Sequence, residues 1–323
     1  MSWLVALWLG VASAAEVRGM TVSCPTWGWE WGSDAMVGTL GVLDDLGVNW
    51  VSIHPYARIR GDGTVDFEPI DPAAPPEWLA RPIREAHRRG QQILIKPHLA
   101  YWGSPFTWRG DIRFADPADR KRFFTTYKAW VRQLAEASRA ADAFSVGTEL
   151  DGTVAHEQEW REVVAAVREV HPGHLTYASN WDRFETVPFW DALDAVGVQA
   201  YFPLVDGESA VTDTDLDAGW DRWLERVRAV HRSTGKHVVF TELGYDSSHR
   251  AAAQPWAPGG WGADDALQER CLRAALRAID REPAVVGAFL WKWFPGEVAR
   301  GDFRLSEPRL RQLIRQHWHS PSP

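Results

Sequence analysis

The chain has 323 residues, of which 45% are hydrophobic and 24% charged, so it has ample apolar material for a core and is not a largely disordered chain. Its formal net charge of -8 and pI near 5.8 argue against a nucleic-acid partner, because affinity for the phosphate backbone rests largely on basic patches.

The N-terminal segment predicts export. An apolar stretch from Trp3 to Val11 precedes the small residues 12–15 (ASAA), as in a signal peptide, although no Lys or Arg precedes the apolar stretch. The alternative is a short N-terminal helix, and the stretch is too short for a comfortable transmembrane span. We expect residues 1–15 to be a signal peptide, residues 16–323 to form the functional domain, a secreted or periplasmic location, and no further membrane insertion.

The rest of the chain alternates between predicted strands and predicted helices. Apolar runs typical of strands lie at 17–23, 49–55, 92–98, 143–149, 175–180, 195–201, 237–242 and 285–291. Apolar residues at three- and four-residue spacing predict helices within 34–47, 76–90, 118–141, 156–173, 217–235, 265–283 and 307–318. Residues 187–194 leave room for only a short helix.

This alternation predicts a parallel sheet, and eight strands in about 300 residues predict a single-domain (β/α)8 TIM barrel. The alternative is a doubly wound open sheet, but no Gly-x-Gly-x-x-Gly follows the first strand. Residues 58–67 (RIRGDGTVDF) predict a small hairpin that turns at Asp62-Gly63.

Barrel enzymes carry their active sites at the C-terminal ends of the strands. The residues that close the expected strands from the second to the eighth are His54, His98, Glu149, Asn180, Tyr201, Glu242 and Trp291. The histidines, the asparagine and the tyrosine each have an ordinary structural explanation. The glutamates differ, because each follows an apolar strand (AFSVGT and HVVFT), where an unpaired carboxylate is costly to bury.

Two carboxylates that converge on one cavity are suited to glycoside hydrolysis. One protonates the leaving oxygen, and the other attacks the anomeric carbon or activates a water. The acid must hold a proton while the other group stays ionised, and neighbouring groups provide that difference. Tyr201 is placed to donate a hydrogen bond to Glu242, because their expected strands are adjacent.

Tryptophan usage also indicates a carbohydrate ligand. The chain has 20 Trp, and the indole ring offers a flat apolar face with one polar N–H, which suits the C–H patches of sugar rings. Packing within loops is the alternative for any single ring. The Trp residues in or beside the loops that follow the strands are Trp27, Trp29, Trp31, Trp102, Trp108, Trp181, Trp190, Trp256, Trp261, Trp291 and Trp293.

Other chemical signals are weak. Cys24 and Cys271 are expected to be two unpaired thiols, and the His-x-His pair at 317 and 319 lies in the C-terminal tail, away from the strand ends. Gly-x-Ser-x-Gly, Walker A and His-Glu-x-x-His patterns are absent. We expect no metal and no organic cofactor, although a metal-dependent hydrolase that uses His54 and His98 is one alternative.

The strand-end residues resemble the clan of retaining glycosidases with (β/α)8 barrels. Within that clan, the segments SVGTEL, FTELGY, KPHLAYW and GAFLWKW are most similar to glycoside hydrolase family 113, which is associated with endo-β-1,4-mannanase activity. The resemblance extends from GMTVSCPTWGW to GAFLWKWF and so covers most of the chain.

The resemblance implies roles for individual residues. Glu149 would be the general acid/base, Glu242 the nucleophile, and Tyr201 the residue that orients Glu242. Sugar contacts would come from His98, Asn180 and Trp291, and Trp27, Trp102 and Trp181 are further substrate-binding candidates. One position departs from the clan, which mostly has Asn immediately before the acid/base to bind the sugar 2-hydroxyl. This chain has Thr148 there, and Asn180 is a candidate for that contact.

The sequence therefore predicts a retaining β-glycosidase that cleaves β-mannan or manno-oligosaccharides through a covalent glycosyl-enzyme intermediate. In such an enzyme the two carboxyl groups lie about 5–5.5 Å apart. The alternatives are the same mechanism on another β-glycan (as a β-glucanase, β-mannosidase or β-galactosidase) and a non-catalytic carbohydrate-binding barrel. No oligomeric state is predicted.

Overall fold

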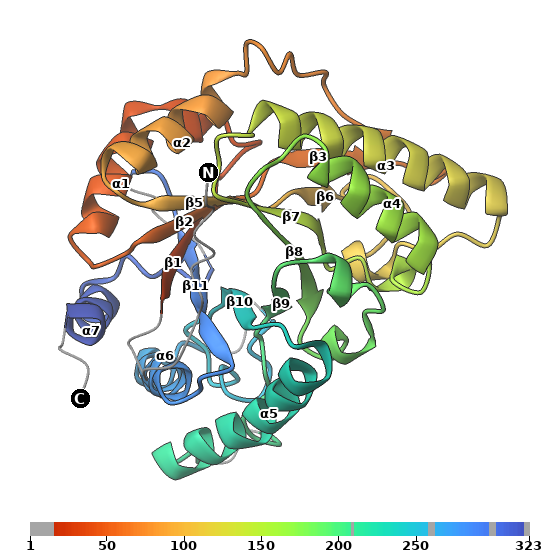
Figure 1. Cartoon of the computed structure of the whole chain (residues 1–323). Coiled ribbons are helices and arrows are strands. Elements are labelled where there is room, and N and C mark those ends of the chain that lie inside the picture. Colours follow the sequence, from red (N-terminus) through yellow and green to blue (C-terminus); the bar gives the residue numbers. More distant parts are fainter. Residues whose placement is uncertain (1–15, 208–209, 258–261, 297–301, 320–323) are drawn as a thin grey trace, which may run out of the picture.

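The computed structural model describes residues 16–207, 210–257, 262–296 and 302–319 (Figure 1). The predicted signal peptide, residues 1–15, lies outside the described residues, and so does Trp261. Across the described residues, no helix is both long and apolar enough to span a bilayer.

Eight strands form a closed barrel, in the order β1-β11-β10-β9-β8-β7-β5-β2. Neighbouring strands of the barrel pair in parallel, and the ring closes where β1 pairs with both β11 and β2. The predicted (β/α)8 barrel is confirmed, and the open sheet is wrong. The strands are β1 (Val17–Val22), β2 (Trp50–Ile53), β5 (Gln92–Ile95), β7 (Ala143–Thr148), β8 (His174–Asn180), β9 (Val196–Gln199), β10 (Val238–Leu243) and β11 (Val285–Trp293).

Helices surround the barrel on its outside (Figure 1). They are α1 (Asp34–Asp44), α2 (Glu77–Arg88), α3 (Pro117–Ala137), α4 (Glu157–Arg168), α5 (Asp213–Thr234), α6 (Asp265–Asp280) and α7 (Pro308–His319). Local sequence sets several of their ends. Asp116 caps α3 just before its first-turn proline, Thr212 forms a capping box at α5, and α5 ends at Gly235 in the left-handed conformation.

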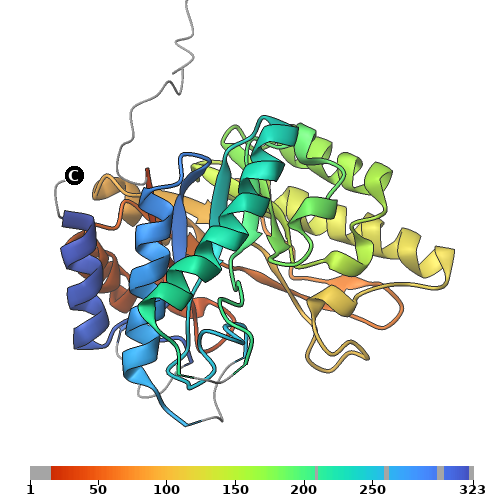
Figure 2. The same cartoon turned by 90° about the horizontal axis from the view of Figure 1, so that it is seen from below.

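The predicted short helix at 187–194 is present as the single turn η5 (Trp190–Ala192). Four more 3-10 turns, η1 (Trp29–Gly32), η2 (Arg109–Asp111), η3 (Asp151–Thr153) and η4 (Phe184–Thr186), lie in loops. The loops that follow β6 and β10 extend from the same side of the barrel, the lower side in Figure 2. The C-terminal ends of the strands therefore share one face, as in other barrels of this class.

A second, small sheet corrects two predicted strands. The barrel strands β2 and β5 end at Ile53 and Ile95, and the chain then forms β3 (Tyr56–Ile59), β4 (Val65–Asp66) and β6 (His98–Ala100). The predicted strands 49–55 and 92–98 are therefore too long, and His98 belongs to the small sheet. A proline follows each barrel strand within two residues, and proline has no N–H to continue the ladder. The predicted hairpin is confirmed as the antiparallel pair β3 and β4.

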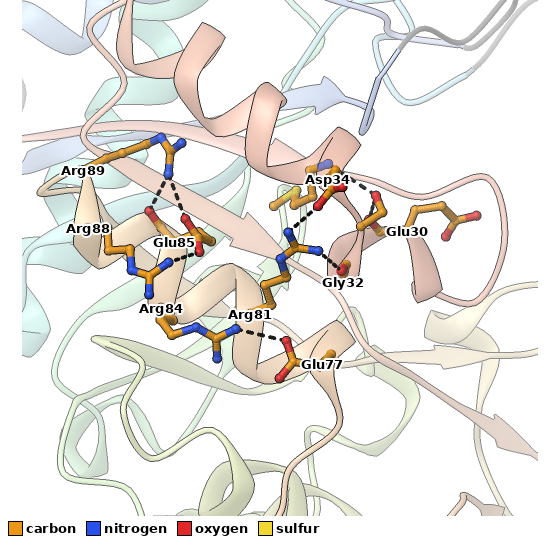
Figure 3. Close-up of polar contacts among 11 residues, drawn as sticks. Glu30, Gly32, Asp34, Glu77, Arg81, Arg84, Glu85, Arg88 and Arg89 are labelled. Carbon is orange, nitrogen blue, oxygen red and sulfur yellow. Dashed lines mark hydrogen bonds and ion pairs between the residues drawn. The ribbon is translucent and has the colours of Figure 1, made fainter.

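Helix α2 anchors the tryptophan-rich loop between β1 and α1. Arg81 donates a hydrogen bond of 2.7 Å to the carbonyl oxygen of Gly32 and contacts Asp34 (Figure 3). In the loop, Gly28 has φ +101°, and a β-carbon there would collide with the ring of Trp31, so the turn requires glycine. These contacts attach the end of the loop, at Gly32 and Asp34, to helix α2.

The two cysteines are free, as predicted, and both are buried; burial raises the pKa of Cys24 to about 12. In the C-terminal helix, His317 lies 2.9 Å from a carboxylate oxygen of Asp280, and His319 contacts the carbonyl oxygen of Asp45. Each member of the His-x-His pair thus contacts a neighbouring element.

Candidate active site

Two glutamates lie at the same face of the barrel, at β7 and β10, with β8 and β9 between them. Glu242 lies in β10 and is 3% exposed. Glu149 directly follows the last residue of β7, and its side chain is 12% exposed. Burial of two carboxylates is costly unless each has partners that stabilise its charge.

Both carboxylate oxygens of Glu242 accept hydrogen bonds from buried donors. Tyr201, just beyond the end of β9, donates through Oη to Oε2 at 2.7 Å, which confirms the contact expected from the sequence. The ammonium of Lys96 contacts Oε1 and also donates to the carbonyl oxygen of Thr241 at 3.2 Å. Donors of this kind favour the ionised form of a carboxyl group. His98 Nε2 lies 3.6 Å from Oε1.

Lys96 is the most prominent residue that the sequence reasoning missed. It directly follows β5, is 0% exposed, and points at Glu242 across the barrel. Burial lowers the pKa of Lys96, and the charge of Glu242 opposes that effect. The sequence contained a signal for it, because a lysine directly after an apolar strand and before a proline occupies the same kind of position as the two glutamates.

The backbone of Glu149 has an unusual conformation. Its φ is +55°, in the left-handed region that residues other than glycine seldom adopt. Hydrogen bonds on both sides hold it, since its N–H donates to the carbonyl oxygen of Ala178 at 2.8 Å and the N–H of Leu150 donates to Tyr177 Oη at 2.9 Å. Conformations of this type cost free energy and concentrate at functional sites.

Arg109 is the charged partner of Glu149. Its Nε donates to Oε2 at 3.0 Å, and a second guanidinium nitrogen contacts the same oxygen. Burial opposes the charge of Arg109, but Glu149 outweighs this effect, so the pKa of Arg109 is raised. Arg109 lies on η2, in the loop between β6 and α3, and no local sequence signal distinguished it.

Beside Glu149, the amide nitrogen of Asn180 donates a hydrogen bond of 2.7 Å to Asp151. Burial raises the pKa of Asp151 to about 6, with a smaller opposing effect from this hydrogen bond. The hydroxyl of Thr148, at the position that departs from the clan, is buried and has no hydrogen-bond partner among the described residues.

Aromatic rings pack together next to Glu242. His54 and His98 stack with ring centroids 4.7 Å apart, and Trp291 stacks on His98 at 6.3 Å. Burial lowers the pKa of both histidines well below the usual value, so both are neutral at neutral pH. The ammonium of Lys96 lies 5.2 Å from the centroid of the Trp291 ring.

Further tryptophans lie on opposite halves of the barrel. Trp27 and Trp102 contact each other and Tyr56, in loops that follow β1 and β6. Trp181 stacks on Trp256 at 5.1 Å, in loops that follow β8 and β10. Trp102 and Trp256 are 53% and 44% exposed, so ring surface on both halves is open to a ligand. In the described parts of the chain, no group of three or more His, Cys, Asp or Glu residues could hold a metal ion.

Comparison with known proteins identifies relatives over nearly the whole chain. The model of Glycoside Hydrolase Family 113 matches residues 21–300. A search of curated proteins returned no match.

Solved structures share the fold. A GH113 β-1,4-mannanase solved as a complex is 21% identical, with a TM-score of 0.80 and coverage of 94% of this chain and 99% of that chain. The GH113 β-mannanase AaManA from Alicyclobacillus acidocaldarius, in complex with ManMIm, is 26% identical, with a TM-score of 0.79 and the same coverage. The β-glucuronidase of Ruminococcus gnavus is 14% identical, with a TM-score of 0.63, over 94% of this chain and 50% of that one, a likeness of fold alone.

Proposed function

Because the chain belongs to Glycoside Hydrolase Family 113, we propose that this glycoside hydrolase cleaves β-1,4-mannosidic bonds in mannan or manno-oligosaccharides with retention of the anomeric configuration. The different surroundings of the two buried glutamates carry the assignment of roles. Glu242 receives a hydrogen bond on each carboxylate oxygen, from Tyr201 and from Lys96. A carboxylate stabilised in this way is suited to nucleophilic attack and poorly suited to donate a proton.

In the first step, an oxygen of Glu242 attacks the anomeric carbon and forms an ester bond to it. The bond from that carbon to the leaving oxygen breaks, and Glu149 gives its proton to this oxygen. In the second step, Glu149 takes a proton from water as that water attacks the anomeric carbon, and Glu242 leaves as a carboxylate. Tyr201 and Lys96 stabilise Glu242 in its ionised form before and after the covalent intermediate.

The aromatic residues support a chain-like sugar substrate. We assign the sugar at the cleavage point to the surface of Trp291 and His98, within reach of Asn180. The rings of Trp27 and Trp102 on one half of the barrel, and of Trp181 on the other, would contact sugars on either side of that point. Two such surfaces fit cleavage within a polymer, because residues of the chain extend in both directions.

The test is hydrolysis of β-1,4-mannan and manno-oligosaccharides by the parent chain, Glu149→Ala, Glu242→Ala and the surface control Glu157→Ala, which changes an exposed ion pair on α4. We expect the parent and the control to release the β-anomer first, seen by NMR, and both site variants to lose activity. Azide should restore turnover of an activated aryl mannoside to both site variants, as the β-azide in Glu149→Ala, where it attacks the glycosyl-enzyme intermediate, and as the α-azide in Glu242→Ala, where it attacks the anomeric carbon directly.

The substrate assignment fails if mannan is untouched while a glucan, galactan or xylan is cleaved. Release of the α-anomer would refute the retaining mechanism and the expected separation of about 5–5.5 Å between the carboxyl groups. If the parent chain hydrolyses none of these polysaccharides but still binds one of them, the protein is a carbohydrate-binding barrel.

We also propose that the protein is exported. The support is the sequence pattern of residues 1–15, with an apolar stretch followed by small residues. Mass spectrometry of the mature protein from the secreted or periplasmic fraction should give an N-terminus near residue 16. An uncut chain recovered with the cytoplasmic fraction would contradict export.

A further inference from the structure

The ion pair between Arg109 and Glu149 conflicts with the role proposed for Glu149. A general acid must carry a proton before the leaving oxygen departs. In the structure, Nε and a second nitrogen of Arg109 both contact Oε2 of Glu149, and the side chains are 17% and 12% exposed. A guanidinium at this distance stabilises the carboxylate, so the free enzyme holds Glu149 in the form that cannot act as an acid.

We propose that Arg109 is a clamp on Glu149 that the leaving-group sugar displaces. In the free enzyme Arg109 holds Glu149 as a carboxylate. When the sugar on the leaving-group side binds, its hydroxyl and ring oxygens accept the hydrogen bonds of Arg109, and Glu149 is free to take a proton from solvent. This inference rests on the acid/base role proposed above for Glu149.

The location of the clamp follows from the reaction geometry. Glu149 must contact the oxygen that joins the two sugars, so the leaving-group sugar has to lie against Glu149, where the guanidinium now is. Arg109 carries five N–H donors and no acceptor, and it binds oxygen acceptors well. The adjacent Trp108 is 38% exposed, so the loop that carries Arg109 borders solvent.

The loop that carries Arg109 and the loop that follows Glu149 are in backbone contact. Gly152 follows Glu149 by three residues, and a β-carbon at Gly152 would collide with the carbonyl oxygen of Ile112 in the loop of Arg109. The backbones of η2 and η3 therefore touch. Because the loops are fixed, release of Glu149 requires only a change in the Arg109 side chain, whose three-carbon stem allows it.

Other charged and titratable groups also act on this pair. Groups on the strands and loops packed around the site interact electrostatically with Glu149 or Arg109. They are Lys96 after β5, Tyr177 in β8, Tyr201 after β9, Glu242 in β10, Asp151 in η3, and Tyr56, His54 and His98 near the small sheet. Arg109 alone among them has a hydrogen bond to the carboxylate of Glu149 in the described part of the chain.

The clamp matches both steps of the reaction. It is open when Glu149 must donate its proton, with the leaving-group sugar bound. Once the proton has moved to the leaving oxygen and that sugar has departed, Arg109 can pair with Glu149 again. Glu149 is then the carboxylate that accepts a proton from the attacking water, and the proton returns to solvent at the end of the cycle.

The test compares two pH profiles. The profile of kcat/KM reports groups in the free enzyme, and that of kcat reports groups in the bound complex. For the parent enzyme with manno-oligosaccharides, we expect the alkaline limb of kcat/KM to lie at lower pH than that of kcat, because Arg109 contacts Glu149 only in the free enzyme. In Arg109→Gln the limb of kcat/KM should move up to that of kcat. Arg109→Lys should keep part of the separation, and the exposed loop variant Arg113→Gln should keep all of it.

The outcomes that overturn the clamp are distinct. If the kcat/KM limb is the same in Arg109→Gln as in the parent, Arg109 does not control Glu149. If Arg109→Gln moves both limbs by the same amount, Arg109 acts on Glu149 equally with and without substrate, and displacement is wrong.

A measurement without turnover separates this inference from the proposed function. In Glu242→Ala labelled with ¹³C-glutamate, the carboxyl signal of Glu149, assigned by its loss in Glu149→Gln, is titrated with and without mannotriose. The clamp predicts that mannotriose moves the titration to higher pH, and that Arg109→Gln moves it without any sugar. If the titration of the Glu149 carboxyl signal is the same in the double variant Glu242→Ala/Arg109→Gln as in Glu242→Ala, the clamp is refuted even if the parent enzyme cleaves mannan. Failure of the parent enzyme to cleave mannan refutes the substrate assignment even if the Arg109 effect is present.

Discussion

Replacement of Lys96 by methionine tests what keeps Glu242 ionised. Lys96 is 0% exposed and its ammonium contacts Oε1 of Glu242, whose side chain is 4% exposed, so solvent screens the pair little. Two unit charges about 4 Å apart interact by about 4 kcal/mol at an effective dielectric constant of about 20. An energy of about 4 kcal/mol corresponds to about three pH units. The hydrogen bond from Tyr201 to Glu242 remains in the variant, so we expect the acidic limb of the kcat/KM profile to shift by about 1 to 3 pH units.

The direction in which the acidic limb should move follows from the mechanism. Glu242 must be ionised to attack, a nearby cation favours the ionised form, and its removal makes protonation easier. The acidic limb of the kcat/KM profile should therefore move to higher pH in Lys96→Met. Well below the limb, kcat/KM should fall about 10- to 1000-fold, and on the alkaline side the loss should be much smaller.

The assay is mannan or manno-oligosaccharide hydrolysis across pH, with thermal unfolding measured in parallel. Loss of one partner of a buried ion pair destabilises proteins by about 3–5 kcal/mol, so activity is measured well below the midpoint of unfolding. Lys128→Met, which removes an exposed ion pair with Glu162, is the control and should leave the profile unchanged. An acidic limb that stays within roughly 0.3 pH units of the parent in Lys96→Met would refute the reasoning, because one pH unit is the smallest expected shift.

Three further predictions concern single contacts. Tyr201→Phe removes the 2.7 Å hydrogen bond to Glu242, and since bonds to charged groups contribute about 1.5–3 kcal/mol, kcat should fall about 10- to 100-fold; a fall of less than twofold in steady-state kinetics would contradict this. Gly152→Ala should lower the midpoint of thermal unfolding by an amount equal to about 1–3 kcal/mol because of the backbone collision, whereas Gly38→Ala, where a β-carbon meets nothing within 4 Å, should be neutral or stabilising. The raised pKa of Asp151, about 6, means that its folded-state protonation adds stability below about pH 4 that is lost as pH rises through 6. Asp151→Asn should therefore unfold at a higher temperature than the parent at pH 8, with a free energy of unfolding larger by at most about 3 kcal/mol. This gain in stability should be smaller at pH 4, and an equal gain at both pH values would exclude the charge of Asp151 as the cause.

The barrel could be predicted from the sequence. Apolar runs of strand length alternate with segments whose apolar residues have helical spacing. Because parallel strands need a crossover between them, this order is compatible with few other folds. Caps such as Asp116 and Thr212 are local, so the helix starts could also be predicted from nearby residues. Glu149, Glu242 and Tyr201 could be predicted because each closes a strand expected from the sequence, and the rule that such ends meet at one face needs no coordinates.

The pairing of charges in the site could not be predicted from the sequence and depends on the folded chain. Lys96 and Glu242 are 146 residues apart in sequence, and Arg109 and Glu149 are 40 apart, with Arg109 in a loop that has no periodic pattern. Closure of the barrel brings the first pair together, and the contact between η2 and η3 positions the second. Pairing of charges in a buried site depends on distances of a few ångströms between distant segments, and the period of a sequence carries no such information.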